Sequence, residues 1–140
     1  MNKWIIFSLI LGFSFSLGSC KKKEVPLVEN GFYFDYKEYG ASKIGGCVAG
    51  GMVNYTWDVN LVNIPSSGSV DITPNYYTEA CDDCCGVQIT NNPVTITYVA
   101  ISGRVWHEGP LVGFDVEVRD ISDVNNGKKI PLKGSYLCGD

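Results

Sequence analysis

The stretch LVGFDVEVR, residues 111–119, alternates apolar and charged side chains over most of its length. Successive side chains of a β-strand point to opposite faces, so a period of two predicts a strand with one buried and one solvated face. The side chains expected to point inward are Val112, Phe114, Val116 and Val118, and those expected outside are Asp115, Glu117 and Arg119. The stretch therefore predicts a half-buried strand in a sheet with one face on the core.

The same alternation recurs on both sides of this stretch. VNYTWDVNL (53–61) and FYFDYKE (32–38) predict two strands, the latter with Phe32, Phe34 and Tyr36 on one side. SVDIT (69–73) predicts a short strand between turn residues, and VTITYVAISGRVW (94–106) a long central strand, because it is β-branched on both faces. NNGKK signals a tight turn before KIPL and SYLC. Seven or eight such strands predict an all-β chain: a single antiparallel β-sandwich, Ig-like or transthyretin-like, with a barrel as the alternative.

A longer pattern surrounds the first stretch. ISGRVWHEGPLVGFDVEVRD resembles the opening of carboxypeptidase regulatory-like domains, and GSY (134–136) resembles the Gly-x-Tyr that follows in that family. The matching positions are Gly103, Val105, Gly109, Pro110, Leu111, Gly113, Val116 and Val118. The resemblance covers residues 101–136 and implies a non-catalytic β-sandwich module of the kind found on exported bacterial proteins.

The N-terminus indicates the compartment. Lys3 precedes an apolar run over residues 4–17, which is shorter than the roughly 20 residues that a membrane-spanning helix needs and is typical of an export signal. The run ends in Leu-Gly-Ser-Cys, which resembles a bacterial lipobox. This resemblance implies that residues 1–19 are a cleaved signal peptide and that Cys20 carries the lipid. Attached chains of this kind hold a protein at a bilayer, at about 0.8 kcal/mol per buried methylene.

Residues 20–30 are expected to be the lipidated cysteine and a polar tether, and residues 31–140 the folded domain. The tether begins with three lysines, which favour anionic head groups. In the lipoprotein sorting rule, an aspartate after the acylated cysteine retains the protein in the inner membrane, and Lys21 stands there instead. The expected location is therefore the cell envelope, with the domain anchored to the outer membrane and facing the periplasm or the outside.

Charge argues against nucleic acid as a partner. The 140-residue chain has a net charge of −4, and residues 25–140 carry seven Lys or Arg against fourteen Asp or Glu. Binding to nucleic acid depends on a basic surface. The expected partners are the lipid bilayer, through acylated Cys20, and a protein or glycan ligand.

The cysteines cluster in ACDDCCG, residues 80–86. With Cys20 lipidated, the disulfide candidates are Cys47, Cys81, Cys84, Cys85 and Cys138. Five thiols form at most two bonds, and we expect Cys47 and Cys138 each to pair with one member of the cluster. The alternative is a zinc or copper site formed by Cys81, Cys84 and Cys85, with Cys47, Cys138 or His107 as the fourth ligand. A redox centre is disfavoured, because Asp82 and Asp83 destabilise a thiolate.

Other candidate residues have structural interpretations. His107, the single histidine, has no nucleophile motif near it and is expected in a solvated loop, so no catalytic residue and no cofactor are predicted. IGGCVAGG (44–51) is expected to be a flexible loop, because it lacks phosphate-loop spacing. Asp120, Asp123 and Asn125 in DISDVNNG are expected in a hairpin turn and not at calcium. Tyr76, Tyr77 and Trp106 are candidates for an aromatic binding platform, although packing is the more frequent use of such residues.

These observations converge on an exported lipoprotein that is a non-catalytic binding or envelope-assembly module. The alternative is a metal-binding or redox protein that uses the cluster at Cys81, Cys84 and Cys85.

Overall fold

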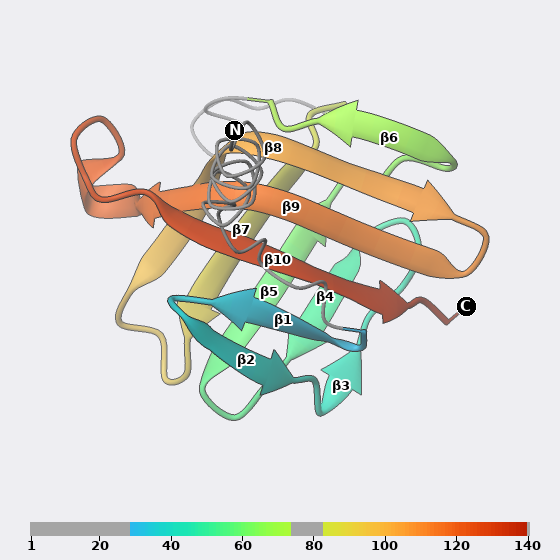
Figure 1. Cartoon of the computed structure of the whole chain (residues 1–140), viewed down its shortest axis with the longest axis horizontal. Helices are drawn as coiled ribbons and strands as arrows, with labels where there is room; N and C mark the ends of the chain where they lie inside the picture. Colours follow the sequence, from blue (N-terminus) through green and yellow to red (C-terminus); the bar gives the residue numbers. More distant parts are fainter. Residues whose placement is uncertain (1–28, 74–82, 140) are drawn as a thin grey trace, which may run out of the picture.

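The computed structural model describes residues 29–73 and 83–139, and there the chain is all-β and antiparallel (Figure 1). The strands are β1 (Gly31–Phe34), β2 (Lys37–Gly40), β3 (Lys43–Ile44), β4 (Gly50–Val53), β5 (Trp57–Val62), β6 (Gly68–Asp71), β7 (Gly86–Asn91), β8 (Thr97–Glu108), β9 (Leu111–Asp120) and β10 (Ile130–Leu137). Nine of them follow the order β2-β1-β10-β9-β8-β7-β5-β4-β3, and β6 pairs with β8. No α-helix lies within these residues; one turn of 3₁₀-helix (Ile121–Asp123) follows β9.

The stretch that opened the sequence analysis forms β9, and its predicted faces are confirmed. All four inward-facing side chains are buried, with exposed fractions of 2% or less, while Asp115 and Glu117 are exposed. β9 pairs with β10 on one side and with β8 on the other, so it lies in the interior of the sheet. The local alternation of the sequence therefore identified both the strand and its buried face.

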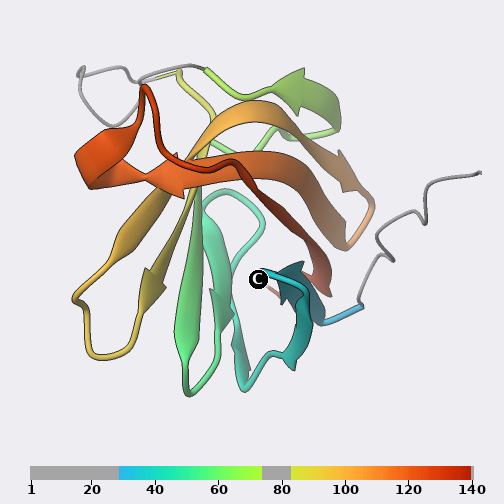
Figure 2. The same ribbon diagram turned by 60° about the vertical axis from the view of Figure 1, so that its left-hand side comes forward.

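β8 curls the sheet. Its first half pairs with β7 and its second half with β6, and its register with β9 shifts between Ala100 and Ser102. A β-bulge of this kind bends a strand and increases its twist. The sheet therefore has two arms: β6, β9, β10 and β1 lie on one side of the bend in β8, and β7, β5 and β4 lie on the other. One arm lies across the other (Figure 2), and together they form a curled half-barrel.

Two consecutive residues, Ala41 and Ser42, connect the two edges of the curled sheet. The Ala41 amide donates to the carbonyl of Asn30 beside β1, and the Ser42 amide donates to the carbonyl of Val53 in β4, at 3.0 and 2.7 Å. Edge strands β2 and β3 are thus neighbours in the chain as well as in space. This short link holds the two ends of the curled sheet together around the core.

The core fills the space inside this curl. Phe34 packs edge-on against Trp57 from β5 and Tyr98 from β8, with ring centroids 4.9 and 5.4 Å apart. Phe114 and Tyr136, from β9 and β10, are fully buried. The core therefore includes side chains from both arms of the sheet.

One expectation about the fold is not confirmed, and two need correction. A two-layer sandwich of seven or eight strands is not confirmed, because continuous ladders join the strands into one curled sheet and ten strands are described. VNYTWDVNL is two strands, since Asn54 accepts from the Thr56 amide and donates its own amide to the Trp57 carbonyl, which makes a turn. FYFDYKE is also a hairpin, because Asp35 and Tyr36 have positive φ, and Tyr36 is 73% exposed.

The long central strand, the inward faces of 57–61 and the hairpin turn at DISDVNNG are confirmed. Two strands were missed. β3 is only two residues long, and β7 (GVQITN) directly follows the cysteine cluster, although Val87 and Ile89 alternate with polar side chains and are buried. The signal peptide at 1–19, Cys20 and almost all of the tether lie outside the described residues. In the part of the chain that the structure describes, no helix has the length and apolar character that crossing a membrane requires.

Candidate functional site: a cysteine–histidine cluster and an open cleft

Three residues far apart in the sequence meet at one end of β8. Cys47 lies in the loop between β3 and β4, His107 near the end of β8, and Cys138 directly after β10. Cys47 and Cys138 form a disulfide with Cα atoms 5.1 Å apart. The Cys138 Sγ lies 3.8 Å from His107 Nε2. Among the described residues, the ligating atoms of these three lie within 4.8 Å of one another, and we call the group the Cys–His cluster.

The imidazole of His107 has a defined orientation. Its Nδ1 lies 2.8 Å from the carbonyl oxygen of Pro65. A carbonyl only accepts hydrogen bonds, so Nδ1 carries the proton, and in the neutral ring Nε2 presents its lone pair to the Cys138 sulfur. His107 is only 9% exposed. The expectation of a solvated loop histidine is therefore wrong: the residue lies within β8, and strand alternation points it inward.

Close backbone packing positions the loop that carries Cys47. A Cβ at Gly45 would approach the Gly51 amide nitrogen to 2.6 Å, so only glycine fits there. The buried Tyr136 hydroxyl donates to the Gly46 carbonyl at 3.1 Å, and burial raises its pKa to about 12. The Cys138 amide donates to the Pro110 carbonyl at 2.8 Å. The Tyr136 hydrogen bond and the disulfide hold the loop against the end of β10, and the Cys138 amide fixes that end to the β8–β9 turn.

The favoured cysteine pairing is wrong for the bonds that are described. Cys47 and Cys138 bond to each other, and neither bonds to a member of the 81–85 cluster. The reason is the curl of the sheet, which brings the β3–β4 loop beside the end of β10 although the two strands lie far apart in the strand order and 91 residues separate the two cysteines. The prediction that Cys47 and Cys138 form disulfides at all is confirmed.

The remaining described cysteines, Cys84 and Cys85, are not members of the Cys–His cluster. Cys84 is disulfide-bonded, and its carbonyl accepts from the Asn63 side chain at 2.7 Å. Cys85 is a buried free thiol, and burial raises its pKa to about 11, which makes it a poor nucleophile. Cys81 lies outside the described residues. Among those described, the group with metal-ligand spacing contains His107 but neither Cys84 nor Cys85.

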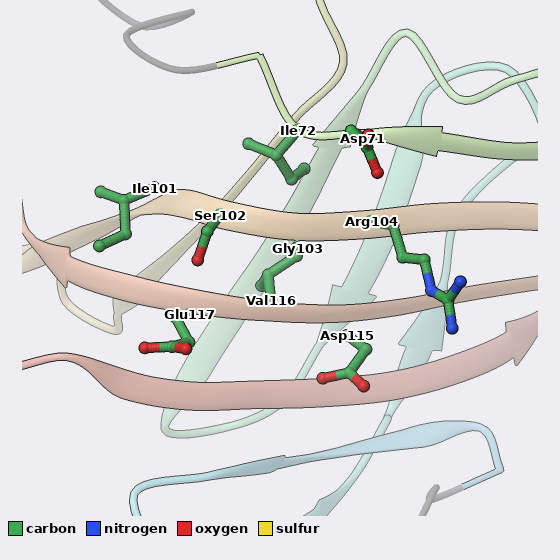
Figure 3. Close-up of a pocket in the computed structure, with 9 residues that line it drawn as sticks. All are labelled: Asp71, Ile72, Ile101, Ser102, Gly103, Arg104, Asp115, Val116 and Glu117. Atoms are coloured by element: carbon green, nitrogen blue, oxygen red, sulfur yellow. The ribbon is translucent and has the colours of Figure 1, made fainter.

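An open cleft of about 650 Å³ lies on the outer surface where β6, β8 and β9 meet (Figure 3). The β7–β8 ladder ends at Val99 and the β6–β8 ladder begins at Arg104, so residues 100–102 have no strand partner on that side among the described strands. Gly103 has φ near +110°, and a Cβ there would collide with the backbone of β9. The cleft therefore exposes strand backbone beside the β8 bulge.

Charged side chains surround this cleft. Arg104 is the cross-strand partner of Asp71 on one side and of Asp115 on the other, and Glu117 lies opposite Ser102. Asp115 also forms an ion pair with Lys133 at 3.7 Å. Three carboxylates and one guanidinium thus line the cleft together with Ile72, Ile101 and Val116. Alternation predicted Asp115 and Glu117 on the outer face, but not their meeting with Arg104.

Two further candidates have structural roles. The Asp120 carboxylate accepts from the Ser122 amide and hydroxyl, which lowers its pKa and caps the 3₁₀ turn. Trp106 lies over Gly113, its cross-strand partner on β9, where a Cβ would collide with the indole ring. Tyr76 and Tyr77, the other members of the expected aromatic platform, lie outside the described residues.

No family model matches this chain, and neither the curated proteins nor the solved structures contain a match to it.

Proposed function

We propose that this protein is a lipid-anchored, exported binding module that captures a polypeptide ligand in the cleft beside the β8 bulge. The single observation that carries the proposal is the Leu-Gly-Ser-Cys motif at residues 17–20, at the end of an apolar run of export-signal length. The proposed protein has three parts: an anchor at Cys20, a basic tether and the curled sheet.

The spacing along the chain supports an anchored arrangement. Ten residues separate Cys20 from the first residue of β1, and three of them are lysines. An extended chain spans about 3.3 Å per residue, so this segment reaches about 30 Å from the membrane surface. Lysines near the surface add about 1 kcal/mol each of attraction to anionic lipid. An outer-membrane location, on the periplasmic or the outer side, follows from Lys21 as part of the same proposal.

The cleft supports a polypeptide as the ligand. Ile101 and Ser102 of β8 line the cleft and lie between two ladders, and a strand from another protein recognises backbone groups at such a place by main-chain hydrogen bonds. Carboxylates outnumber the guanidinium around the cleft, which favours a ligand segment with Lys or Arg. The finer fold assignment, an Ig-like or transthyretin-like sandwich, stays part of this proposal and is supported by the two arms that face each other across the core.

Lipid attachment is tested by labelling bacterial cells with a palmitate analogue. We expect label on the wild-type chain and none on a Cys20→Ala variant. Cys85→Ala, which removes a cysteine elsewhere, is the matched control and should keep the label. A wild-type chain that retains residues 1–19 and takes up no palmitate would overturn the anchor.

Ligand capture is tested separately with a photoreactive amino acid. Placed at exposed Ser102 in the cleft, it should crosslink to a polypeptide in living cells. Placed at Tyr55, which is 88% exposed on the β4–β5 turn, it should give no such product. The Ser102 product should disappear when Glu117→Lys reverses one charge of the cleft. Equal crosslinking from both positions, or a product insensitive to Glu117→Lys, would rule out this cleft as the binding surface.

A further inference from the structure

The Cys–His cluster combines two sulfurs and an imidazole nitrogen that the proposed function does not use. We propose that reduction of the Cys47–Cys138 disulfide converts this cluster into a site for Zn²⁺, with Cys47, His107 and Cys138 as its ligands. The inference is independent of lipid attachment at Cys20 and of the cleft. It assigns the metal to a different set of cysteines from the one that the sequence pattern favoured.

The distances fit a tetrahedral zinc site. Zn–S bonds of about 2.3 Å and Zn–N bonds of about 2.0–2.1 Å place sulfur and nitrogen ligands about 3.6 Å apart, and two sulfurs about 3.8 Å apart. Cys138 Sγ and His107 Nε2 are already 3.8 Å apart. The Cys47 sulfur, which lies on a loop, is the one that moves, by rotation about its Cα–Cβ bond after the bond to Cys138 is broken.

The hydrogen bond of His107 is a second and independent indication. Histidines that ligate zinc almost always donate their other ring N–H to a carbonyl or carboxylate, which fixes the ring and its tautomer. The Nδ1–H of His107 donates to the Pro65 carbonyl at 2.8 Å, and the ring is buried. Its Nε2 lone pair therefore points at the sulfurs before any metal arrives, so binding needs little reorganisation of the histidine.

The chemistry is balanced with a dithiol as the reductant. The dithiol donates two electrons and two protons, the sulfur–sulfur bond breaks into two cysteine thiols, and the dithiol becomes a disulfide. Zn²⁺ then binds two thiolates and Nε2, and two protons are released to solvent. Three protein ligands leave a fourth position for water, which is the coordination of an open site. The oxidised cluster has no thiolate and is expected to bind no metal.

The test uses the full chain purified in mild detergent, reduced with a phosphine that is then removed. Co²⁺ is the probe, because its thiolate charge-transfer absorption reports cysteine ligation, and Zn²⁺ displaces it competitively. We expect one high-affinity Co²⁺ site in the reduced protein and none in the oxidised protein. His107→Gln and Cys47→Ser should each weaken binding by more than tenfold. Cys85→Ser, which leaves the cluster intact, is the matched control and should not change it.

A measurement on the unmodified protein guards against variants that fail to fold. Zn²⁺ should protect Cys47 and Cys138 of the reduced chain from alkylation by iodoacetamide, as mapped by peptide mass. Protection confined to the cysteines of residues 81–85, or loss of binding in Cys85→Ser with retention in Cys47→Ser, would place the metal elsewhere and overturn the inference. Failure of the reduced wild-type chain to bind Co²⁺ would overturn it as well.

Discussion

The Cys47–Cys138 disulfide should be a major source of stability, and replacing both cysteines by alanine tests this. The bond closes a loop of 91 residues. For such a loop, the chain-entropy relation gives a loss of about 15 cal/mol/K of conformational entropy in the cross-linked unfolded chain. Removing the bond restores this entropy and stabilises the unfolded state by about 4.5 kcal/mol at 25 °C. For a domain of roughly 110 residues, a loss of about 4.5 kcal/mol corresponds to a fall in Tm of about 20 °C. That loss is comparable to the whole stability of many small domains.

The assay is urea-induced unfolding followed by tryptophan fluorescence under oxidising conditions with a chelator present. Trp57 is a suitable reporter, because its ring packs against Phe34 and Tyr98 inside the core. Beyond the shift in midpoint, the entropic mechanism predicts a larger m-value in the double variant, since the uncrosslinked unfolded chain exposes more surface. Loss of native contacts alone would leave the m-value unchanged.

Cys85→Ala is the matched control, because it removes one buried sulfur and no described cross-link. We expect it to cost about 1 kcal/mol, as for the loss of a small buried group. The reasoning is refuted if the double variant loses no more stability than this control. It is refuted equally if the stability falls by several kcal/mol while the m-value stays constant, because the effect would then arise in the folded state.

Three smaller predictions concern the backbone, the buried hydroxyl and alkaline pH. Gly103→Ala should cost about 3 kcal/mol or more in urea melts, because its φ is near +110° and its Cβ would meet the β9 backbone, whereas Gly40→Ala, with open space around it, should stay within about 0.5 kcal/mol. Tyr136→Phe should cost about 1 kcal/mol in the same assay, since it removes the hydrogen bond to the glycine-rich loop; no measurable loss would show that this bond does not hold the loop. Burial raises the pKa of Cys85 to about 11 and that of Tyr136 to about 12, so both groups release their protons at lower pH in the unfolded chain than in the folded one. Stability should therefore hold up to about pH 9 and fall above it, with a smaller fall in Cys85→Ala; a rise in the free energy of unfolding above pH 9 would contradict this.

Much of the fold could be predicted from local patterns. The faces of β9, the length of β8 and the inward side chains of β5 all followed from alternation. The breaks inside 32–38 and 53–61 did not, because the alternating pattern continues without interruption through their turns of two and three residues. Asn54 caps its own turn and Asp35 and Tyr36 adopt positive φ, and neither fact changes the hydrophobic pattern around them.

The candidate sites differ more clearly in what the sequence and the tertiary structure each determine. The sequence by itself determined that the described part of the chain is all-β and which side chains of its main strands face the core, because alternation is a property of each strand's own backbone. Only the tertiary structure decided that Cys47 pairs with Cys138, that His107 is buried beside them, and that Arg104 lies between Asp71 and Asp115. Those meetings depend on which strands pair and on the bend of β8 at its bulge, and both are set by packing between segments far apart in the chain.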